Sequence, residues 1–462
     1  MTKKTLIKCG WLVSMDPATG ESENTDILIE DDIISAIGPQ LEAPADEVID
    51  AGDMIVMPGL VEAHIHTWQT GLRGVGAEWV SVDYHKNMHG NMATRFNAHD
   101  VYLGNLFGAL AQIDMGVTTI LDWSHSLRDL EMAESAIDGL EEAKIRAVFA
   151  HGTAKPPSTP EGVPFGRIPH PRERVEALRK NRLTSDDQLV TLAMAILGPE
   201  FSSWDVTLKD FTLARDLGLL SSAHVWHGYN RSMPEEEVKD GYAKLSKLGL
   251  LGPDHNVVHG NYVQDDQLKM MLDDGVSITS TVLVETHGHG AEPLLCKVRD
   301  RGLMPSIGID TALIVSDDMF CEMRAALTFA RYREHFNARE SGNYPIAEIP
   351  VKTREALEWA TIGGARALQL EDKIGSLAVG KKADLVMLGA NGLNLFPVHD
   401  PLLSVVELAN SANVSSVMIN GEFQKRDGKL VYPEDKFRNL KTKFQESLTR
   451  IMKDSQFVPG AK

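Results

Sequence analysis

The chain has 462 residues, of which 43% are hydrophobic and 24% are charged, and this composition is ordinary for a globular enzyme. Asp and Glu outnumber Lys and Arg by 65 to 46, and the net charge of -19 disfavours nucleic acids and anionic membranes as partners because both attract positive charge. No apolar run of about 18 residues occurs, so we expect no membrane-spanning segment.

Residues 1–57 have the pattern of short strands and turns. The segments TLIKCGWLVSM and DILIEDDIISAIG are rich in β-forming residues, and Asp31-Asp32 falls where a hairpin turn is expected. The N-terminus has Lys3 and Lys4, but its apolar positions are interrupted and no small-residue cleavage site follows. We therefore expect no signal peptide.

Residues 58–364 alternate strand and helix patterns. Near-continuous apolar strands separated by helices indicate a parallel sheet covered on its outside, and eight such strands favour a closed (β/α)8 barrel. An open doubly wound sheet is the alternative, but no glycine-rich dinucleotide fingerprint follows the early strands. The eight strands are expected at 61–67, 116–123, 145–152, 189–198, 219–227, 256–263, 276–282 and 305–310. After the third strand, residues 154–174 are rich in Pro and Gly and form a long loop on the face where barrel active sites lie.

The C-terminal part returns to β patterns. The segment KKADLVML reads as a strand, and Asn420-Gly421 between two alternating runs is a strong hairpin signal. We therefore expect residues 1–57 and 365–433 to form one small β-sandwich domain beside a barrel over 58–364. In the C-terminal segment 434–462, a helix over 434–453 has one apolar stripe, which favours packing against the chain's own body over a subunit contact. The stripe consists of Phe437, Leu440, Phe444, Leu448 and Ile451.

Two histidines end the first barrel strand. In a strand, alternate residues point to the same side, so His64 and His66 face one way and Ile65 faces the other. Two neutral imidazoles that converge on one point are half of a metal site. The pair alone is weak evidence, because two histidines on a surface or in a core are common.

Further polar side chains fall on later strands. His224 ends the fifth strand, His259 lies on the sixth, and Asp310 ends the eighth. Since catalytic groups of such barrels come from the C-terminal ends of several strands, we expect four imidazoles and one carboxylate to meet at one mouth. Nitrogen ligands with one carboxylate suit zinc, iron or cobalt, and a water bound there becomes a nucleophile near neutral pH. Asp310 can then carry the proton.

Three segments of the chain resemble the amidohydrolase superfamily, in the branch of cytosine-deaminase-like, chlorotriazine and related metal-dependent hydrolases. The segments are PGLVEAHIHTWQTGLRG, GIDTALIVSDDMFCEMRAAL and ATIGGARALQLEDKIGSLAVGKKADLVML. The resemblance implies metal ligands His64, His66, His224 and Asp310, with His259 bonded to the substrate or to the attacking water. The fourth strand ends in MAILGPE without the lysine that bridges two metals in binuclear members. We therefore expect one divalent ion per chain.

Two departures from this branch bear on the substrate. Its deaminases usually carry a glutamate three residues after the fifth-strand histidine, where this chain has His227, a candidate proton carrier. They also carry a histidine motif near the end of the seventh strand, whereas this chain has Glu285, His287 and His289 just beyond it. These three side chains either reach the site or structure a loop.

A closer similarity links WQTGLRGVGAEW, MAILGP and SDDMF to the subgroup that includes molinate hydrolase and phenylurea hydrolases. We assign substrate contacts to Trp68, Gln69, Glu285 and His287, and catalytic roles to His259, Asp310 and His227. Six aromatic residues near strand ends suggest an apolar pocket, although each alone fits an ordinary core. They are Trp68, Trp79, Tyr84, Trp123, Phe165 and Trp226. His125 and His151, which follow the second and third strands, are candidates for supporting the ligands.

The sequence thus predicts a mononuclear metal-dependent hydrolase of an uncharged carbamate, thiocarbamate or urea, with attack at the carbonyl carbon. A deaminase or chlorohydrolase of an aminated nitrogen heterocycle is the alternative, and a non-enzymatic scaffold is a third interpretation that the complete ligand set disfavours. Cys9, Cys296 and Cys321 form no CxxC pair, so we expect reduced thiols in the cytoplasm. We also expect a homo-oligomer.

Overall fold

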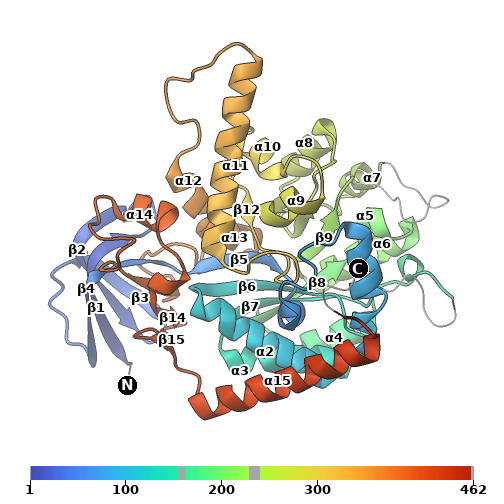
Figure 1. The fold of residues 1–462 in the computed structure, drawn as a ribbon, viewed down its shortest axis with the longest axis horizontal. Helices are drawn as coiled ribbons and strands as arrows, with labels where there is room; N and C mark the ends of the chain where they lie inside the picture. Colours follow the sequence, from blue (N-terminus) through green and yellow to red (C-terminus); the bar gives the residue numbers. More distant parts are fainter. Residues whose placement is uncertain (1, 156–161, 228–239, 459–462) are drawn as a thin grey trace.

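The computed structural model describes residues 2–155, 162–227 and 240–458. Two sheets organise these residues (Figure 1). Residues 156–161 of the predicted Pro- and Gly-rich loop, and the last four of the C-terminal segment 434–462, lie outside the described residues.

The first sheet is built from both ends of the chain, as predicted. Its strand order is β16-β15-β14-β13-β4-β1-β2-β3. The predicted hairpins are present: Asp31 lies between β2 and β3, and Asn420 between β14 and β15, both with the left-handed φ that such turns require. The strands are β1 (Lys4–Val13), β2 (Glu21–Glu30), β3 (Ile33–Pro39), β4 (Glu47–Pro58), β13 (Leu385–Gly389), β14 (Val414–Ile419), β15 (Glu422–Arg426) and β16 (Lys429–Leu430).

The second sheet is a barrel of eight parallel strands, which confirms the predicted fold class. Each strand pairs with the next one in the chain. Every predicted strand is present, although all but the second and third end two to four residues earlier than predicted. At the end of the sixth strand, His259 has a left-handed φ of 70° that does not continue a strand, and Asp310, three residues after the eighth, has the same φ. The strands are β5 (Leu60–Ile65), β6 (Val117–Ser124), β7 (Arg146–His151), β8 (Val190–Ile196), β9 (Ser221–Val225), β10 (His255–His259), β11 (Ser277–Ser280) and β12 (Ser306–Ile307).

The barrel closes where β5 meets the segment after β12. Ile65 and Asp310 form a parallel bridge, and the buried Glu62 carboxylate accepts hydrogen bonds from the backbone N–H groups of His64 and Ile309 at 3.0 and 2.9 Å. Burial raises the pKa of Glu62 to about 8. This closure fixes the ends of the first and last strands next to each other.

Helices surround the barrel, and the core lies between them and the strands (Figure 1). The longer helices are α2 (Ala98–Asp114), α3 (Leu130–Ala143), α4 (Arg172–Asn181), α6 (Trp204–Asp216), α8 (Asp265–Asp273), α11 (Met319–Glu340) and α15 (Glu434–Ser455). The shorter ones are α1 (Ser81–Asp83), α5 (Gly198–Phe201), α7 (Gly241–Lys247), α9 (Val282–Gly288), α10 (Leu294–Arg299), α12 (Thr353–Glu358), α13 (Gly364–Ala367) and α14 (Pro401–Glu407).

The C-terminal helix α15 packs along the barrel helix α2, as its stripe predicts. The Phe444 ring lies 4.9 Å from the Phe107 ring, and the Ser447 hydroxyl donates to Asp100 at 2.6 Å. The β domain is tied to the barrel by a buried ion pair, in which Arg146 of β7 donates to Asp384 at 2.6 Å. The barrel therefore contacts the C-terminal helix at α2 and the β domain at β7.

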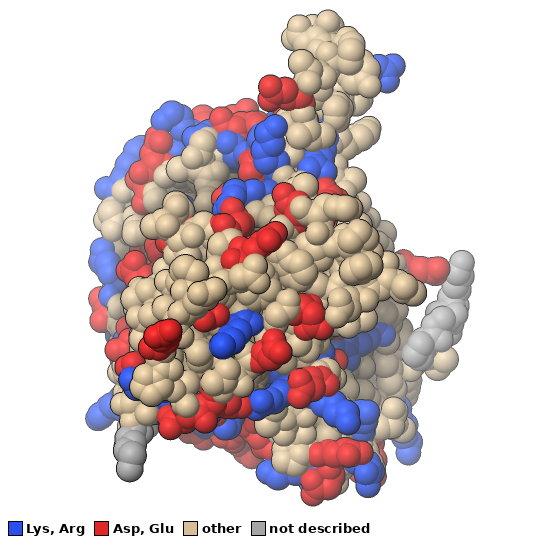
Figure 2. Space-filling model, turned by 90° about the vertical axis from the view of Figure 1, so that its left-hand side faces the viewer, with Lys and Arg blue, Asp and Glu red and all other residues tan. Residues whose placement is uncertain are grey.

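The end of α11 and the loop after it project from the body (Figure 1) and carry the exposed aromatic side chains of Tyr332, Phe336 and Tyr344. Figure 2 shows acidic and basic groups interspersed over the face below this projection. Among the described residues, no helix combines the length and apolar character needed to cross a bilayer. Cys9, Cys296 and Cys321 are free thiols.

Candidate metal centre and cavity

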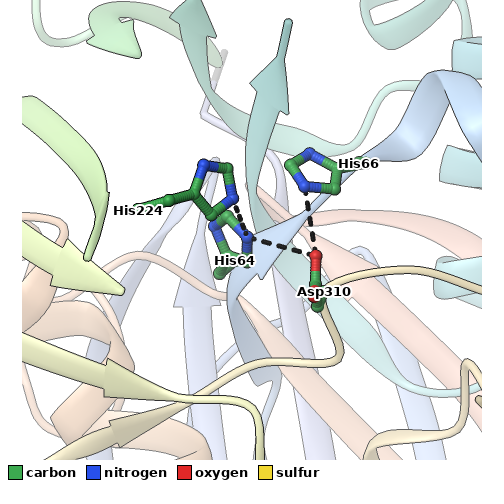
Figure 3. A group of neighbouring side chains, drawn as sticks. All are labelled: His64, His66, His224 and Asp310. Atoms are coloured by element: carbon green, nitrogen blue, oxygen red, sulfur yellow. Dashed lines mark hydrogen bonds and ion pairs between the residues drawn. The ribbon is translucent and has the colours of Figure 1, made fainter. Parts of the chain in front are cut away.

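Four side chains converge at the C-terminal mouth of the barrel (Figure 3). One ligand atom from each of His64, His66, His224 and Asp310 lies within 4.8 Å of the others. The Asp310 Oδ1 atom is 3.1 Å from His66 Nε2 and 3.5 Å from His64 Nε2, and His224 Nε2 is 3.2 Å from His64 Nε2. The four predicted metal ligands therefore form one group.

The barrel strands position these ligands. The Asp310 N–H donates to the His64 carbonyl and the His66 N–H donates to the Asp310 carbonyl, both at 2.8 Å, so the three backbones are locked together. His66 Nδ1 donates to the Trp123 carbonyl at 2.7 Å. A hydrogen bond of this kind fixes the tautomer and leaves the Nε2 lone pair directed at the cluster.

The donor set fits a divalent ion. Burial lowers the pKa of His64 to about 3 and that of His224 well below its usual value, so both imidazoles are neutral and can coordinate. Burial alone would raise the pKa of Asp310, but hydrogen bonds with His64 and His66 outweigh it and hold this pKa well below its usual value. The His64 Nδ1 atom has no partner among the described residues. Three nitrogens and one carboxylate are ligands that zinc accepts.

His259 stands beside this group. Its Nε2 lies 3.9 Å from Asp310 Oδ2, and its ring stacks on His224 at 5.5 Å. His259 and Asp310 share a left-handed φ of 70°, a conformation that costs of order 1 kcal/mol and that occurs frequently at functional sites. Burial lowers the pKa of His259 to about 4.

Glu285, a predicted substrate contact, lies behind His259. Its Oε1 is 3.3 Å from His259 Nδ1 and accepts the Thr281 N–H at 2.8 Å. Its Oε2 accepts from Asn261, whose Oδ1 atom is 2.7 Å from Nδ1 of His289. Burial raises the pKa of Glu285 to about 7. Among the described residues, Glu285 is not part of the cavity wall, but it is linked to two imidazoles, His259 and His289, that are.

A cavity of about 400 Å³ opens over the cluster. His66, His224, His259 and Asp310 form its floor, and its wall combines five Trp, Tyr and Phe side chains and several aliphatic ones with five further histidines. The predicted aromatic side chains are therefore present, although polar groups share the wall with them. The aromatic wall residues are Trp79, Tyr84, Phe165, Phe201 and Trp226. Trp79, Tyr84, Phe165 and Trp226 were predicted from sequence, whereas Phe201 of α5 was missed.

The other predicted substrate residues fall in different places. His287 of α9 lines the cavity, and its Nε2 is 3.1 Å from the Trp79 carbonyl oxygen. Trp68 and Gln69 lie in the 3₁₀ helix Thr67–Leu72 and are buried outside the described cavity wall. The Trp68 Nε1 donates to His125, and Gln69 donates to the Tyr84 hydroxyl at 2.9 Å. Trp68 and Gln69 therefore support wall residues in this structure.

Of the three remaining predicted histidines, one lines the cavity and two lie outside its described wall. His227 follows β9, its ring stacks on Tyr262, and its Nδ1 lies 3.3 Å from Glu200 Oε1, outside the described cavity wall. His125 lines the cavity and stacks on His66 at 4.0 Å, so it does support a ligand. His151 lies away from the cavity and contacts His170, with Nδ1 to Nε2 at 2.8 Å.

Lys155 was not predicted from sequence. It lies four residues after β7, in the loop that follows the third barrel strand, and lines the cavity. Its Nζ is 3.4 Å from His224 Nδ1 and 4.6 Å from the centre of the Trp123 ring. Enclosure lowers the pKa of Lys155 to about 7. A lysine in a loop without periodicity gives no positional signal in the sequence.

Comparisons with known proteins agree with this geometry. Residues 55–424 match the model of the amidohydrolase family. The chain is 25% identical over 455 residues to 5'-deoxyadenosine deaminase of Methanosarcina barkeri, covering 96% of this chain and 99% of that protein. The chain belongs to the amidohydrolase family.

Solved structures show the same fold. An adenosine deaminase from Xanthomonas campestris with bound zinc superimposes with a TM-score of 0.80 at 22% identity, covering 98% of this chain and 99% of that one. The atrazine chlorohydrolase of Arthrobacter aurescens TC1, complexed with zinc, gives 0.79 at 19% identity, covering 97% and 100%. At 22% and 19% identity, these two likenesses show the fold.

Proposed function

We propose that this protein hydrolyses a substituted nitrogen heterocycle and replaces an amino group or a halide on a ring carbon by oxygen. The observation that carries the proposal is the joint arrangement of His64, His66, His224 and Asp310 below an aromatic cavity of about 400 Å³. A flat ring matches aromatic walls, because ring faces and edges pack on one another favourably. The cavity volume fits a small-molecule substrate.

The residues have separable tasks. A divalent ion held by the three histidines and Asp310, with one ion per chain and zinc as the first choice, supplies an activated water as the nucleophile. Asp310 would accept a proton from the attacking water, and its Oδ2 atom lies 3.9 Å from His259 Nε2. The Thr281 hydroxyl lies 3.1 Å from His259 Nδ1 and can donate to it, which leaves the hydrogen of the neutral ring on Nε2. With Glu285 behind it, His259 would then donate from Nε2 toward the reacting centre and stabilise negative charge that builds there.

The printed functions of the relatives support this substrate class. The sequence relatives include deaminases of 5'-deoxyadenosine and of 5-methylthioadenosine or S-adenosylhomocysteine, and the structural relatives include an adenosine deaminase and an atrazine chlorohydrolase. In each of these named substrates, the group that is replaced is attached to a nitrogen heterocycle. We propose the same class here and a cytoplasmic location, in line with the free thiols.

Hydrolysis of a carbamate, thiocarbamate or urea is the second candidate. Two observations favour it. By the resemblance stated above, His227 occupies the position where the related deaminases usually have a glutamate, and Asp310 on the floor is the one carboxylate among the described residues that line the cavity. Proton delivery to a departing amine requires a positioned acid. A carbonyl substrate makes a smaller demand, because its oxygen can be stabilised by the hydrogen bond of His259.

A substrate panel separates the two candidates. Purified protein loaded with zinc is incubated with aminated purines and pyrimidines, with chloro- and amino-triazines, and with carbamates, thiocarbamates and phenylureas. The proposal expects release of ammonia, amine or chloride from at least one heterocycle. Turnover confined to the carbonyl compounds would replace it by the second candidate, and turnover of none would contradict both.

A further inference from the structure

Lys155 supplies a hydrogen-bond donor at the cavity floor. Among the described lining residues it is the one Lys or Arg side chain. Its Nζ lies over the faces of two aromatic rings, at 4.6 Å from Trp123 and 5.6 Å from Phe201, and 3.4 Å from His224 Nδ1. None of the described carboxylates forms an ion pair with it. An amine head group enclosed by aromatic rings and without a carboxylate partner needs another acceptor.

His224 cannot be that acceptor when the ion is bound. An imidazole that coordinates through Nε2 carries its hydrogen on Nδ1, so it becomes a donor toward Lys155. The His224 Nε2 atom faces His64 in the cluster, and Nδ1 faces Lys155. The N–H groups of Lys155 are then left for a molecule in the cavity.

Two imidazoles of the wall already have partners. His287 Nε2 contacts the Trp79 carbonyl and His289 Nδ1 contacts Asn261. Burial lowers the pKa of His289 to about 4, so its ring is neutral. Lys155 carries N–H donors in either of its protonation states. It is therefore a donor next to the ligand cluster that is not paired with a described carboxylate.

We propose that Lys155 is a catalytic and specificity-determining residue that donates a hydrogen bond to the ring nitrogen adjacent to the carbon under attack. This inference rests on the proposed function and narrows its substrate class to heterocycles with an acceptor nitrogen at that position, as in purines, pyrimidines and triazines. His259 and Lys155 then stabilise charge on different atoms of one substrate.

The reaction balances without net proton transfer from Lys155. The water oxygen forms the bond to the ring carbon, and the electron pair of the C=N bond moves to the ring nitrogen. The bond to the amine or halide then breaks. One water proton ends on the ring nitrogen and the other leaves with the amine or as acid with the halide. Charge peaks on the ring nitrogen during the addition, and a donor fixed there in an enclosed site is worth ~10²–10³ in rate.

The test compares Lys155→Met, which removes the donor, with Lys155→Arg, which keeps donors. Lys86→Met is the matched control, because Lys86 is an exposed lysine in the segment at the cavity mouth and does not line the cavity. On the best heterocycle of the panel, we expect kcat/KM to fall ~10²–10³-fold in Lys155→Met, to recover partly in Lys155→Arg and to stay unchanged in Lys86→Met, all with unchanged zinc content.

A binding measurement tests the role of Lys155 without depending on turnover. Adenine and 1-deazaadenine differ by replacement of the ring nitrogen next to the amino-bearing carbon with CH, and calorimetry gives the affinity of each for the zinc-loaded protein. We expect the wild type to prefer adenine by about 10-fold, the size of one lost hydrogen bond, and Lys155→Met to bind both equally.

The two proposals fail in distinguishable ways. An equal affinity for the two bases in the wild type, a preference for adenine that survives in Lys155→Met, or full activity of that variant would overturn the role of Lys155 and leave the proposed function standing. A preference that depends on Lys155, in a protein that turns over no heterocycle, would support the donor and contradict the reaction.

Discussion

The floor and the wall of the cavity are built in different ways. The floor consists of side chains at or just after the ends of β5, β9, β10 and β12, and their backbones are locked by ladder hydrogen bonds such as that from the Asp310 N–H to the His64 carbonyl. The wall comes from connecting segments, with Trp79 before α1, Phe165 in a 3₁₀ turn and His287 in α9. The predicted metal ligands thus lie at the ends of barrel strands, and the cavity wall lies mainly on the segments that connect them.

This difference predicts that substitutions in the floor and in the wall change different kinetic constants. A change in the floor alters the ion or the groups at the reacting carbon and lowers kcat. A change in the wall alters how substrate is held and acts mainly on KM. The following predictions run from the largest expected effect to the smallest, and each would weaken the division if it failed.

His64→Ala removes a floor ligand and leaves an open coordination position. We expect loss of most of the bound ion and a fall in kcat/KM of at least ~10³-fold, since the activated water disappears with the ion. Elemental analysis and steady-state rates measure both, with wild type expected to hold one ion per chain. The exposed His399, replaced by Ala, is the control and should change neither value. Two ions per wild-type chain, or activity that resists chelation, would contradict the single site.

His259→Ala removes a side chain that stands beside the ligands without being one of them. We expect the ion to stay and kcat to fall by ~10²–10³-fold, the usual loss of one such donor. Glu285→Gln should cost less, about 10-fold, because it weakens only the contact that holds His259. If His259→Ala instead emptied the site, His259 would be a ligand.

Trp79→Ala opens the wall, where the Trp79 ring also packs on Phe457 at 5.5 Å. We expect KM to rise about 5- to 10-fold with kcat changed less than twofold, because ring contacts of ~1–1.5 kcal/mol are lost from bound substrate. Steady-state kinetics on one substrate measures the split. Trp204→Ala, on α6 and outside the described cavity wall, controls for the general loss of a tryptophan. A kcat effect larger than the KM effect would place Trp79 with the floor.

The sequence predicted the floor better than the wall for a physical reason. Strand periodicity puts His64 and His66 on one side, and parallel strands bring the distant His224, His259 and Asp310 to one edge. Loop residues obey no such period. Lys155 was missed for this reason. Trp68 and Gln69 were predicted to contact substrate, although the 3₁₀ turn directs them into the core.

The surroundings of Glu285 and His227 depend on contacts that the periodicity of the sequence does not predict. Glu285 was expected at the substrate, but α9 begins directly after β11 and turns its carboxylate back onto His259. His227 stands three residues after His224, and its Nδ1 lies beside Glu200, a partner from α5 that no local pattern reveals. The substrate class likewise depends on the wall, so it is the part of the function that the sequence predicted least well.

The smallest effect concerns the anchor of a wall loop. Asp210 of α6 accepts the backbone N–H of His170 at 2.8 Å and so ties the segment that carries Phe165 to the barrel. Burial raises the pKa of Asp210 to about 7, against about 3.9 in an unfolded chain. The folded state therefore binds the proton more tightly, and its stability falls as pH rises from about 4 to 7.

Asp210→Asn keeps the acceptor oxygen and cannot ionise, so it should escape this loss. We expect the variant to be more stable than wild type at pH 8, by on the order of 1 kcal/mol or more at about 1.4 kcal/mol per unit of pKa difference, and to gain much less at pH 5. Denaturant unfolding at both pH values measures the difference, in which the other titrating groups cancel. Asp216→Asn, exposed on the same helix, should show no such gain. A variant that loses more stability at pH 8 than at pH 5 would mean that the ionised carboxylate is stabilised in the folded protein, and the loop would then be held by charge.

Because this anchor lies outside the cavity, kcat should stay unchanged in Asp210→Asn, and a fall in kcat would show that the wall loop also sets the geometry of the floor.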